Sequence, residues 1–324
     1  MRTTPRWSLC ALVTSGCTAA AFGQVAYETV VLKDQPAPGT PSTVKFQSFL
    51  TRPVLNANGQ PCFIGNLTGT GVTSATNSGV WAGIGSELQL CVREGAAAPG
   101  TSSGVTFSGF LDTVYNANGQ VLIQATLRGT GVTASNDSGL WAGTPDNIGL
   151  VAREGGAVPG VSGAAFAGMS SPVFNNRGEI AFFAVISGTG VNHTNDVGIW
   201  MGPAGGLALV AREGSQAADL PAGTLYGSVF GPVINHNGAI AFRSTLQGTG
   251  VDTTNDIGVW AGLPNNLKLV ARKGQQAPGL PSGVKWLVPG DPAINDAGQI
   301  AFVSLLTGTG VTSANDKGIW SGTA

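Results

Sequence analysis

One block of residues recurs five times along this 324-residue chain, and that recurrence constrains the fold more than any other feature. Its clearest marker is a tryptophan, which recurs at spacings of 60, 59, 60 and 60 residues. These tryptophans are Trp81, Trp141, Trp200, Trp260 and Trp320. A fixed period of this length is typical of repeat architectures, in which each repeat is one supersecondary unit. We therefore predict a single five-repeat domain over residues 25–324, with the tryptophans as wedges between repeats.

Each repeat is predicted to contain four short strands. In the third copy they cover about residues 165–174, 179–186, 198–202 and 207–213, with turn residues between them. The second strand is apolar on both faces, which is typical of a sheet packed between two others. No segment shows a sustained helical period. Four antiparallel strands per repeat indicate an all-β fold, a β-propeller of five four-stranded blades.

The two ends of the chain predict how the ring closes. Residues 27–32 alternate as a strand and match the last strand of a repeat, whereas the fifth repeat stops after its third strand, at Trp320. An open array would expose unpaired strand edges, which proteins avoid. We therefore expect the N-terminal strand to complete the fifth blade and close the propeller.

The first 24 residues differ from the rest and are predicted to be a signal peptide. They begin with Arg2 and Arg6, continue with an apolar core over residues 7–21, and end in small residues. This pattern predicts a secreted protein, extracellular or periplasmic. Lipid attachment at Cys17 is the alternative. No later stretch is long and apolar enough to span a membrane, so no transmembrane segment is expected in the mature chain.

Composition excludes one class of partner. Only 10% of the residues are charged, the net charge is −1, and no basic run stands out, so nucleic acid is not an expected partner. Cys62 and Cys91 remain after the leader. A disulfide is compatible with export, but two small buried hydrophobes are the favoured interpretation, because the two residues are predicted to lie on strands that are not neighbours.

The repeated motifs carry a family resemblance. The N-x-x-G-x-x-A-F pattern starts at Asn175, Asn235 and Asn295, and it recurs with G-T-G-V, N-D-x-G-I-W and V-A-R-E-G segments. In these motifs the chain resembles exported bacterial tandem-repeat proteins of the NxxGxxAF-repeat, choice-of-anchor type. The resemblance implies export and a surface or envelope role, and it supplies no catalytic residues. The hydrophobic, Arg-flanked C-terminal anchor of many such proteins is not seen, so attachment by that route is not expected.

Alternating strand direction places the two long polar loops of each repeat on one face, where we expect any ligand to bind. The recurring charged residues of that face are Asp137, Asp196, Asp256, Asp316, Arg93, Arg153, Arg212 and Arg272. The aspartates could bind calcium, but a structural role in their own turns is favoured, and no cofactor is predicted. The arginines could bind an anionic ligand, but tying a loop to the next blade is favoured.

Residues that break the repeat are the better candidates for catalysis. The innermost strand carries Arg52, Asp112 and Asp291 at corresponding positions. Two carboxylates and an arginine could support acid-base chemistry on a glycan, whereas ordinary channel lining is the favoured interpretation. The sequence therefore predicts a binding or envelope-associated structural module of unknown specific activity, whose partner is a glycan or another envelope protein. A carbohydrate-active hydrolase or lyase is the alternative.

Overall fold

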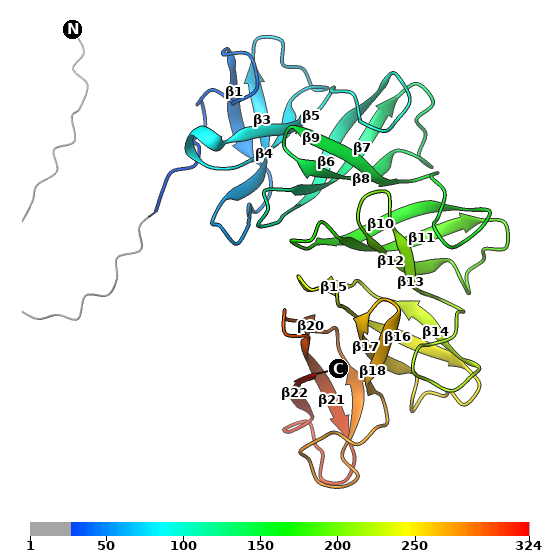
Figure 1. Ribbon diagram of the computed structural model, residues 1–324. Helices are drawn as coiled ribbons and strands as arrows, with labels where there is room; N and C mark the ends of the chain where they lie inside the picture. The colour runs from blue at the N-terminus through cyan, green and yellow to red at the C-terminus, as the bar shows by residue number, and fades with distance from the viewer. Residues whose placement is uncertain (1–26, 324) are drawn as a thin grey trace, which may run out of the picture. The chain divides into compact units, whose positions relative to one another are not determined.

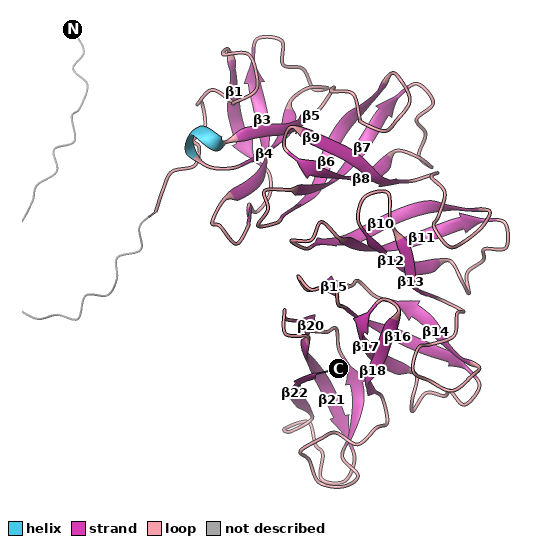
Figure 2. Cartoon of the chain, viewed as in Figure 1, coloured by secondary structure: helices cyan, strands magenta, loops and turns pink. Residues whose placement is uncertain are grey.

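The computed structural model describes residues 27–323, and strands dominate this part of the chain (Figures 1 and 2). The one helical element among these residues is a single 3-10 turn, η1 (Gly85–Glu87). None of these residues forms a helix long and apolar enough to span a membrane. The predicted signal peptide, residues 1–24, and Cys17 lie outside the described residues.

Five antiparallel sheets follow one another along residues 44–323 (Figure 1). Sheet 1 contains β1 (Val44–Phe49), β2 (Val54–Leu55), β3 (Pro61–Gly69), β4 (Ser78–Ala82) and β5 (Gln89–Arg93). Sheet 2 contains β6 (Val105–Tyr115), β7 (Val121–Gly129), β8 (Ser138–Thr144) and β9 (Asn147–Arg153). Sheet 3 contains β10 (Ala164–Phe174), β11 (Ile180–Gly188), β12 (Val197–Gly202) and β13 (Ala208–Arg212). Sheet 4 contains β14 (Thr224–Val229), β15 (Val233–Ile234), β16 (Ile240–Gly248), β17 (Ile257–Leu263) and β18 (Asn266–Arg272). Sheet 5 contains β19 (Lys285–Pro289), β20 (Ala293–Ile294), β21 (Gln299–Thr307) and β22 (Lys317–Thr323).

The strands of each sheet lie in chain order, as a meander. The prediction of four strands in the third repeat is confirmed, because β10, β11, β12 and β13 pair successively. In sheets 1, 4 and 5 the first strand is split in two by a gap that ends at Pro53, Pro232 and Pro292. In sheet 3, β10 carries Pro172 at the same place and stays one strand, but its pairing with β11 shifts register between Ser170 and Val173. Proline has no amide hydrogen to donate to the neighbouring strand, so the ladder is interrupted there.

The core lies between successive sheets rather than inside any one of them. Each of these buried clusters contains side chains from two successive sheets, which pack against each other. Trp141 of sheet 2, for example, packs in one cluster with Ile64 and Val80 of sheet 1. Its indole also donates to the carbonyl of Pro99, at 3.0 Å. The predicted role of the tryptophans as wedges between repeats is confirmed for sheets 2 to 4.

The glycine two residues before each tryptophan makes room for the indole. A Cβ at Gly198 would lie 2.8 Å from the ring of Trp200 and 3.0 Å from the carbonyl oxygen of Ala211. The same conflict with the tryptophan ring exists at Gly79, Gly139, Gly258 and Gly318. The G-x-W spacing in the sequence is therefore a packing requirement.

The expected closing strand is not formed. Residues 27–32 have no strand structure, and within residues 27–323 β22 pairs with β21 alone. The backbone hydrogen bond seen at this segment is a local turn, from the amide of Gln35 to the carbonyl of Leu32 at 3.3 Å, and a turn within one stretch does not build a strand. Within residues 27–323 no further sheet covers the face of sheet 5 that carries Ile319. Ile319 is 77% exposed, whereas Ile199 at the same place in sheet 3 is fully buried.

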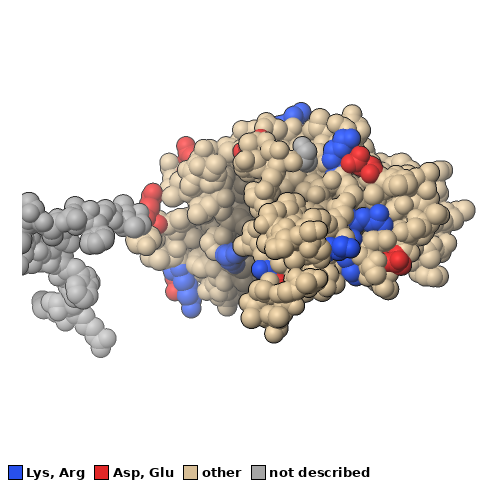
Figure 3. Space-filling model, turned by 90° about the horizontal axis from the view of Figure 1, so that it is seen from below, with Lys and Arg blue, Asp and Glu red and all other residues tan. Residues whose placement is uncertain are grey.

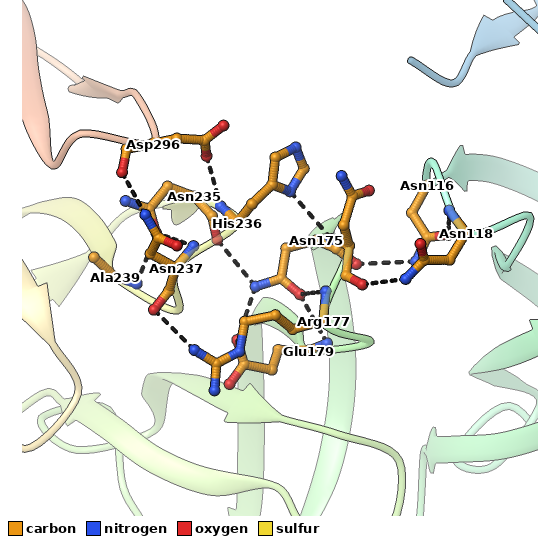
Figure 4. A network of polar contacts seen from close by, with 11 residues as sticks. Asn116, Asn118, Asn175, Arg177, Glu179, Asn235, His236, Asn237, Ala239 and Asp296 are labelled. Carbon is orange, nitrogen blue, oxygen red and sulfur yellow. Dashed lines mark hydrogen bonds and ion pairs between the residues drawn. The ribbon is translucent and has the colours of Figure 1, made fainter. Parts of the chain in front are cut away.

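The N-x-x-G turns form a ladder from sheet to sheet (Figure 4). The Asn175 side chain accepts from the amides of Arg177 and Glu179 and donates to the carbonyl of Asn235 in the next sheet, at 3.0 Å. Asn56, Asn116 and Asn235 donate in the same way to the next sheet. An amide side chain can accept and donate at once. The asparagine therefore closes its own turn and joins two sheets.

Candidate functional site

In sheets 2, 3 and 4 the long loop before the third strand is held by an asparagine and an arginine of the same sheet, whereas in sheet 1 Thr76 takes the place of the asparagine. In sheet 2, Asn136 accepts from the amide of Thr133 and donates to the carbonyl of Gly131. The Nε of Arg153, at the end of β9, donates to the carbonyl of Asn136, at 2.8 Å. Arg93, Arg212 and Arg272 bond the corresponding loop of their own sheets.

These contacts correct two expectations. We expected the recurring Asp to hold the turn, but the preceding Asn does so in sheets 2 to 5, because an amide side chain can donate as well as accept, whereas an ionised carboxylate only accepts. Asp137, Asp196, Asp256 and Asp316 contribute a backbone carbonyl to the second strand instead. We also expected the arginines to reach the next sheet. Within residues 27–323 their side-chain hydrogen bonds stay in their own sheet, because the last strand ends beside the start of the third.

The residue that follows each arginine is charged, and it is Glu in sheets 1 to 3. Glu94 is buried and accepts from the amides of Asn77 and Ser78, each at 3.0 Å. Burial, together with the carboxylate of Asp137, raises the pKa of Glu154 above its usual value. The pKa of Glu213 is raised by burial and by the neighbouring charge of Asp196.

In sheet 4 the corresponding residue is a lysine. The Nζ of Lys273 lies 2.9 Å from Oδ1 of Asp256 and forms an ion pair with it. In sheets 2 and 3 the Glu at this position is repelled by the neighbouring Asp, whereas in sheet 4 Lys273 attracts Asp256.

Within residues 27–323 no hydrogen bond or ion pair joins any two of the three candidate catalytic residues, Arg52, Asp112 and Asp291, to one another. Asp112 accepts from the amide of Thr113, and Arg52 is exposed. Asp291 instead pairs with a residue that the sequence did not single out. Its Oδ1 lies 2.7 Å from the Nε of Arg243, whose guanidinium lies 3.9 Å from the centre of the Phe230 ring.

Arg243 could have been found by comparing repeats. It stands in β16 where the other second strands carry Ile64, Gln124, Phe183 or Val303. The innermost strand also holds a strained backbone at Ser171, with φ of 52°. A residue of this kind with positive φ is uncommon and marks a local constraint.

A cavity of about 560 Å³ opens between sheets 4 and 5, on the face of the long loops. Its polar and aromatic lining includes Asn255, Arg272, Lys273, Gln275, Lys285 and Trp286. Three other cavities, of about 320 to 430 Å³, are each lined by at most one Lys or Arg. Of the residues predicted to bind a ligand, Arg272 lines the largest of these four cavities. Asp256 does not line the cavity but forms an ion pair with Lys273, which does.

Much of the molecular surface carries neither sign of charge, as the view in Figure 3 shows, in keeping with the composition. Against this background three cations around one cavity are a local concentration of charge.

Cys62 and Cys91 are free thiols, as favoured from the sequence. Burial raises the pKa of Cys62 to about 12, so its thiol stays protonated near neutral pH.

Three solved structures illustrate what the chain is similar to. A polysaccharide lyase, Uly1, is 12% identical with a TM-score of 0.37, covering 88% of this chain and 60% of that one. A puromycin hydrolase is 11% identical with a TM-score of 0.34, covering 80% and 34%. A GH43 β-1,3-galactosidase is 11% identical with a TM-score of 0.29, covering 79% and 84%. The chain thus spans about a third to three fifths of the first structures it matches.

A search of curated proteins gave no match. One family model matches twice, over residues 20–146 and 123–323, and the two matches together span nearly the whole repeat region. The chain therefore belongs to the family of unknown function DUF7453.

Proposed function

We propose that the protein is an exported binding module, with its five sheets as the blades of a β-propeller of the NxxGxxAF-repeat type. The observation that carries the binding role is the cavity between sheets 4 and 5. It lies on the face of the long loops, and its lining departs from the repeat at Lys273, which replaces the Glu of sheets 1 to 3. Residues needed only for folding tend to recur in every repeat, whereas a site breaks the repeat.

The proposed partner is a glycan or another protein of the cell envelope, and the proposed location is outside the cytoplasm. Pockets that take small ligands occupy about 300–1,000 Å³ and place a few polar groups at fixed positions. The cavity falls within this range and carries amide, hydroxyl and cationic groups.

A thermal-shift screen of the purified protein against a panel of glycans tests the binding role. We expect at least one glycan to raise the melting temperature. NMR chemical-shift changes with that glycan are expected at the backbone amides of residues 253–255 and 272–275. A panel without any binder, or shifts confined to the short turns on the opposite face, would remove the support for this proposal.

Calcium is tested in the same assay. We expect a chelator to leave the melting temperature unchanged, because the turns before the third strands are closed by asparagine and arginine contacts. A chelator-induced drop in the melting temperature that calcium reverses would show that the aspartates bind the metal after all.

A carbohydrate-active enzyme is the second candidate, and the ion pair between Arg243 and Asp291 is the observation that favours it. Arg243 of β16, held beside the carboxylate of Asp291 between β19 and β20, could orient a sugar. The assay is release of reducing sugar from the glycans that bind. We expect none. Release that is lost in Asp291→Asn and in Asp112→Asn would establish the enzyme instead.

A further inference from the structure

The charge of the loop face is reversed where sheet 4 meets sheet 5. Glu213 and Lys273 occupy the same place, because the amide of each donates to the first residue of the third strand in its own sheet, at 2.9 and 2.8 Å. In the same way Leu225 and Lys285 form matching bridges with Gln216 and Gln276. Two positions that are acidic and apolar between sheets 3 and 4 are therefore both cationic between sheets 4 and 5.

The cavity at this junction holds an excess of positive charge. Arg272, Lys273 and Lys285 line it, and Asp256 balances one of them. Arg272 is fixed by bonds of 2.8 and 2.9 Å to Asn255, and Lys285 is exposed and forms no ion pair within residues 27–323. An anionic group entering the cavity would thus meet a lysine that has no partner of its own.

A buried donor without an acceptor lies in the same wall. Trp286 is 5% exposed, and its Nε1 has no hydrogen-bond partner within the described part of the chain. The equivalent residues of the other sheets are Phe46, Phe107, Phe166 and Tyr226, none of which has an indole nitrogen. Buried polar groups in native proteins are nearly always hydrogen-bonded. This exception indicates a place where an acceptor comes from outside the chain.

We propose that this cavity binds an acidic saccharide, whose carboxylate or sulfate group is held by Lys273 and Lys285. The uncharged part of the lining suits the rest of such a ligand, because Thr253, Thr254 and Gln275 supply hydroxyl and amide groups for sugar hydroxyls. The inference rests on the proposed binding function and names the class of ligand. The negative charge of a polyanionic saccharide is also complementary to the positive charge that distinguishes this junction from the others.

Isothermal titration calorimetry with three probes tests the inference: oligomers of polygalacturonate, which carry carboxylates, dextran sulfate oligomers, and uncharged dextran. We expect at least one anionic probe to bind and dextran not to bind. The key variant is Lys273→Glu, which installs the residue that sheets 1 to 3 carry at this place and is therefore compatible with the fold. We expect it to weaken binding about tenfold or more, since it reverses a charge beside the ligand.

Lys268→Glu is the matched control. Lys268 lies in β18 and makes an exposed ion pair of 3.5 Å with Asp219, and it does not line the cavity. We expect affinity within about twofold of the unchanged protein, as for a distant, independent site. Trp286→Phe, which again copies another repeat, is expected to weaken binding while the melting temperature stays close to that of the unchanged protein.

The outcomes separate the two proposals. Binding of dextran but of neither anionic probe, with NMR shifts at the cavity, would refute the acidic ligand and leave the binding module intact. Equal losses for Lys273→Glu and Lys268→Glu would show that attraction to the whole surface, and not the cavity, explains the binding. If none of the three probes binds, the acidic-saccharide inference fails, and the binding role is then decided by the glycan panel of the thermal-shift screen.

Discussion

The asparagine ladder makes a quantitative prediction for Asn175→Ala. Asn175 is 1% exposed and makes four hydrogen bonds, with lengths between 2.8 and 3.0 Å. Two of these satisfy the amides of Arg177 and Glu179, one reaches the Glu179 carboxylate, and one crosses to Asn235 of sheet 4. Alanine would leave two amides without an acceptor and would cut the link between sheets.

A polar group left unsatisfied away from water costs about 1–3 kcal/mol; the bonds to the amides of Arg177 and Glu179 are part-buried, and the bridge to Asn235 is buried. The Asn235 carbonyl keeps its bond from Gly238, so we assign the cost to the two amides and the lost bridge. The expected loss is roughly 3–5 kcal/mol in the free energy of unfolding. Urea denaturation followed by tryptophan fluorescence measures it, because the tryptophans lie between the sheets.

Asn295→Ala is the matched control, since Asn295 is exposed and its side chain bonds only Gln299 of its own turn. We expect a loss of about 1 kcal/mol or less, because water can replace these bonds. Equal losses for the two variants would refute the reasoning. Equality would mean that the turn alone matters and that the bridge to the next sheet contributes nothing.

Two further predictions concern packing and pH. Gly198→Ala should lower the melting temperature, with a cost of about 1–3 kcal/mol in the free energy of unfolding, because the new methyl group would overlap the Trp200 ring. Gly322→Ala should leave the melting temperature unchanged, because nothing lies within 4 Å of a Cβ at that position. A similar loss at both sites would contradict the packing argument. Glu213→Gln should raise the melting temperature near neutral pH, because the raised folded-state pKa of Glu213 means that its ionised form destabilises the fold. That penalty is present above the folded-state pKa and disappears as the pH falls to the unfolded value, so the gain should vanish at acidic pH. A gain that is independent of pH would show that ionisation beside Asp196 is not its cause.

Much of the fold could be predicted from the sequence because its signals are local and repeated. The alternation of β11 and the turn residues reflect neighbours within about ten residues, and the tryptophan period repeats this local pattern every 59 or 60 residues. Together they predicted the meander of four strands seen in sheets 2 and 3, whereas the first strand of sheets 1, 4 and 5 is split. The burial of the tryptophans also followed, since a large apolar side chain at one repeated position must pack against the next unit.

The candidate site was predictable only in part. The sequence indicated the face on which the cavity between sheets 4 and 5 opens, and Arg272, which lines it, was among the predicted residues. Arg243 was missed, although a comparison of the second strands would have shown it as the one cation at its place. The choice of Asp over Asn as the residue that closes the loop was wrong, because a repeated charge attracts attention while the geometry requires a group that both donates and accepts.

By itself the sequence determined the repeat, the strands and the faces they bury, because each depends on side chains a few positions apart. Only the tertiary structure decided which groups meet. Lys273 and Trp286 belong to different sheets, and they line one cavity because sheet 4 packs on sheet 5. The structure also decided that within residues 27–323 β22 pairs with β21 alone, because pairing of distant strands depends on whether a partner reaches that edge and not on the pattern within either strand.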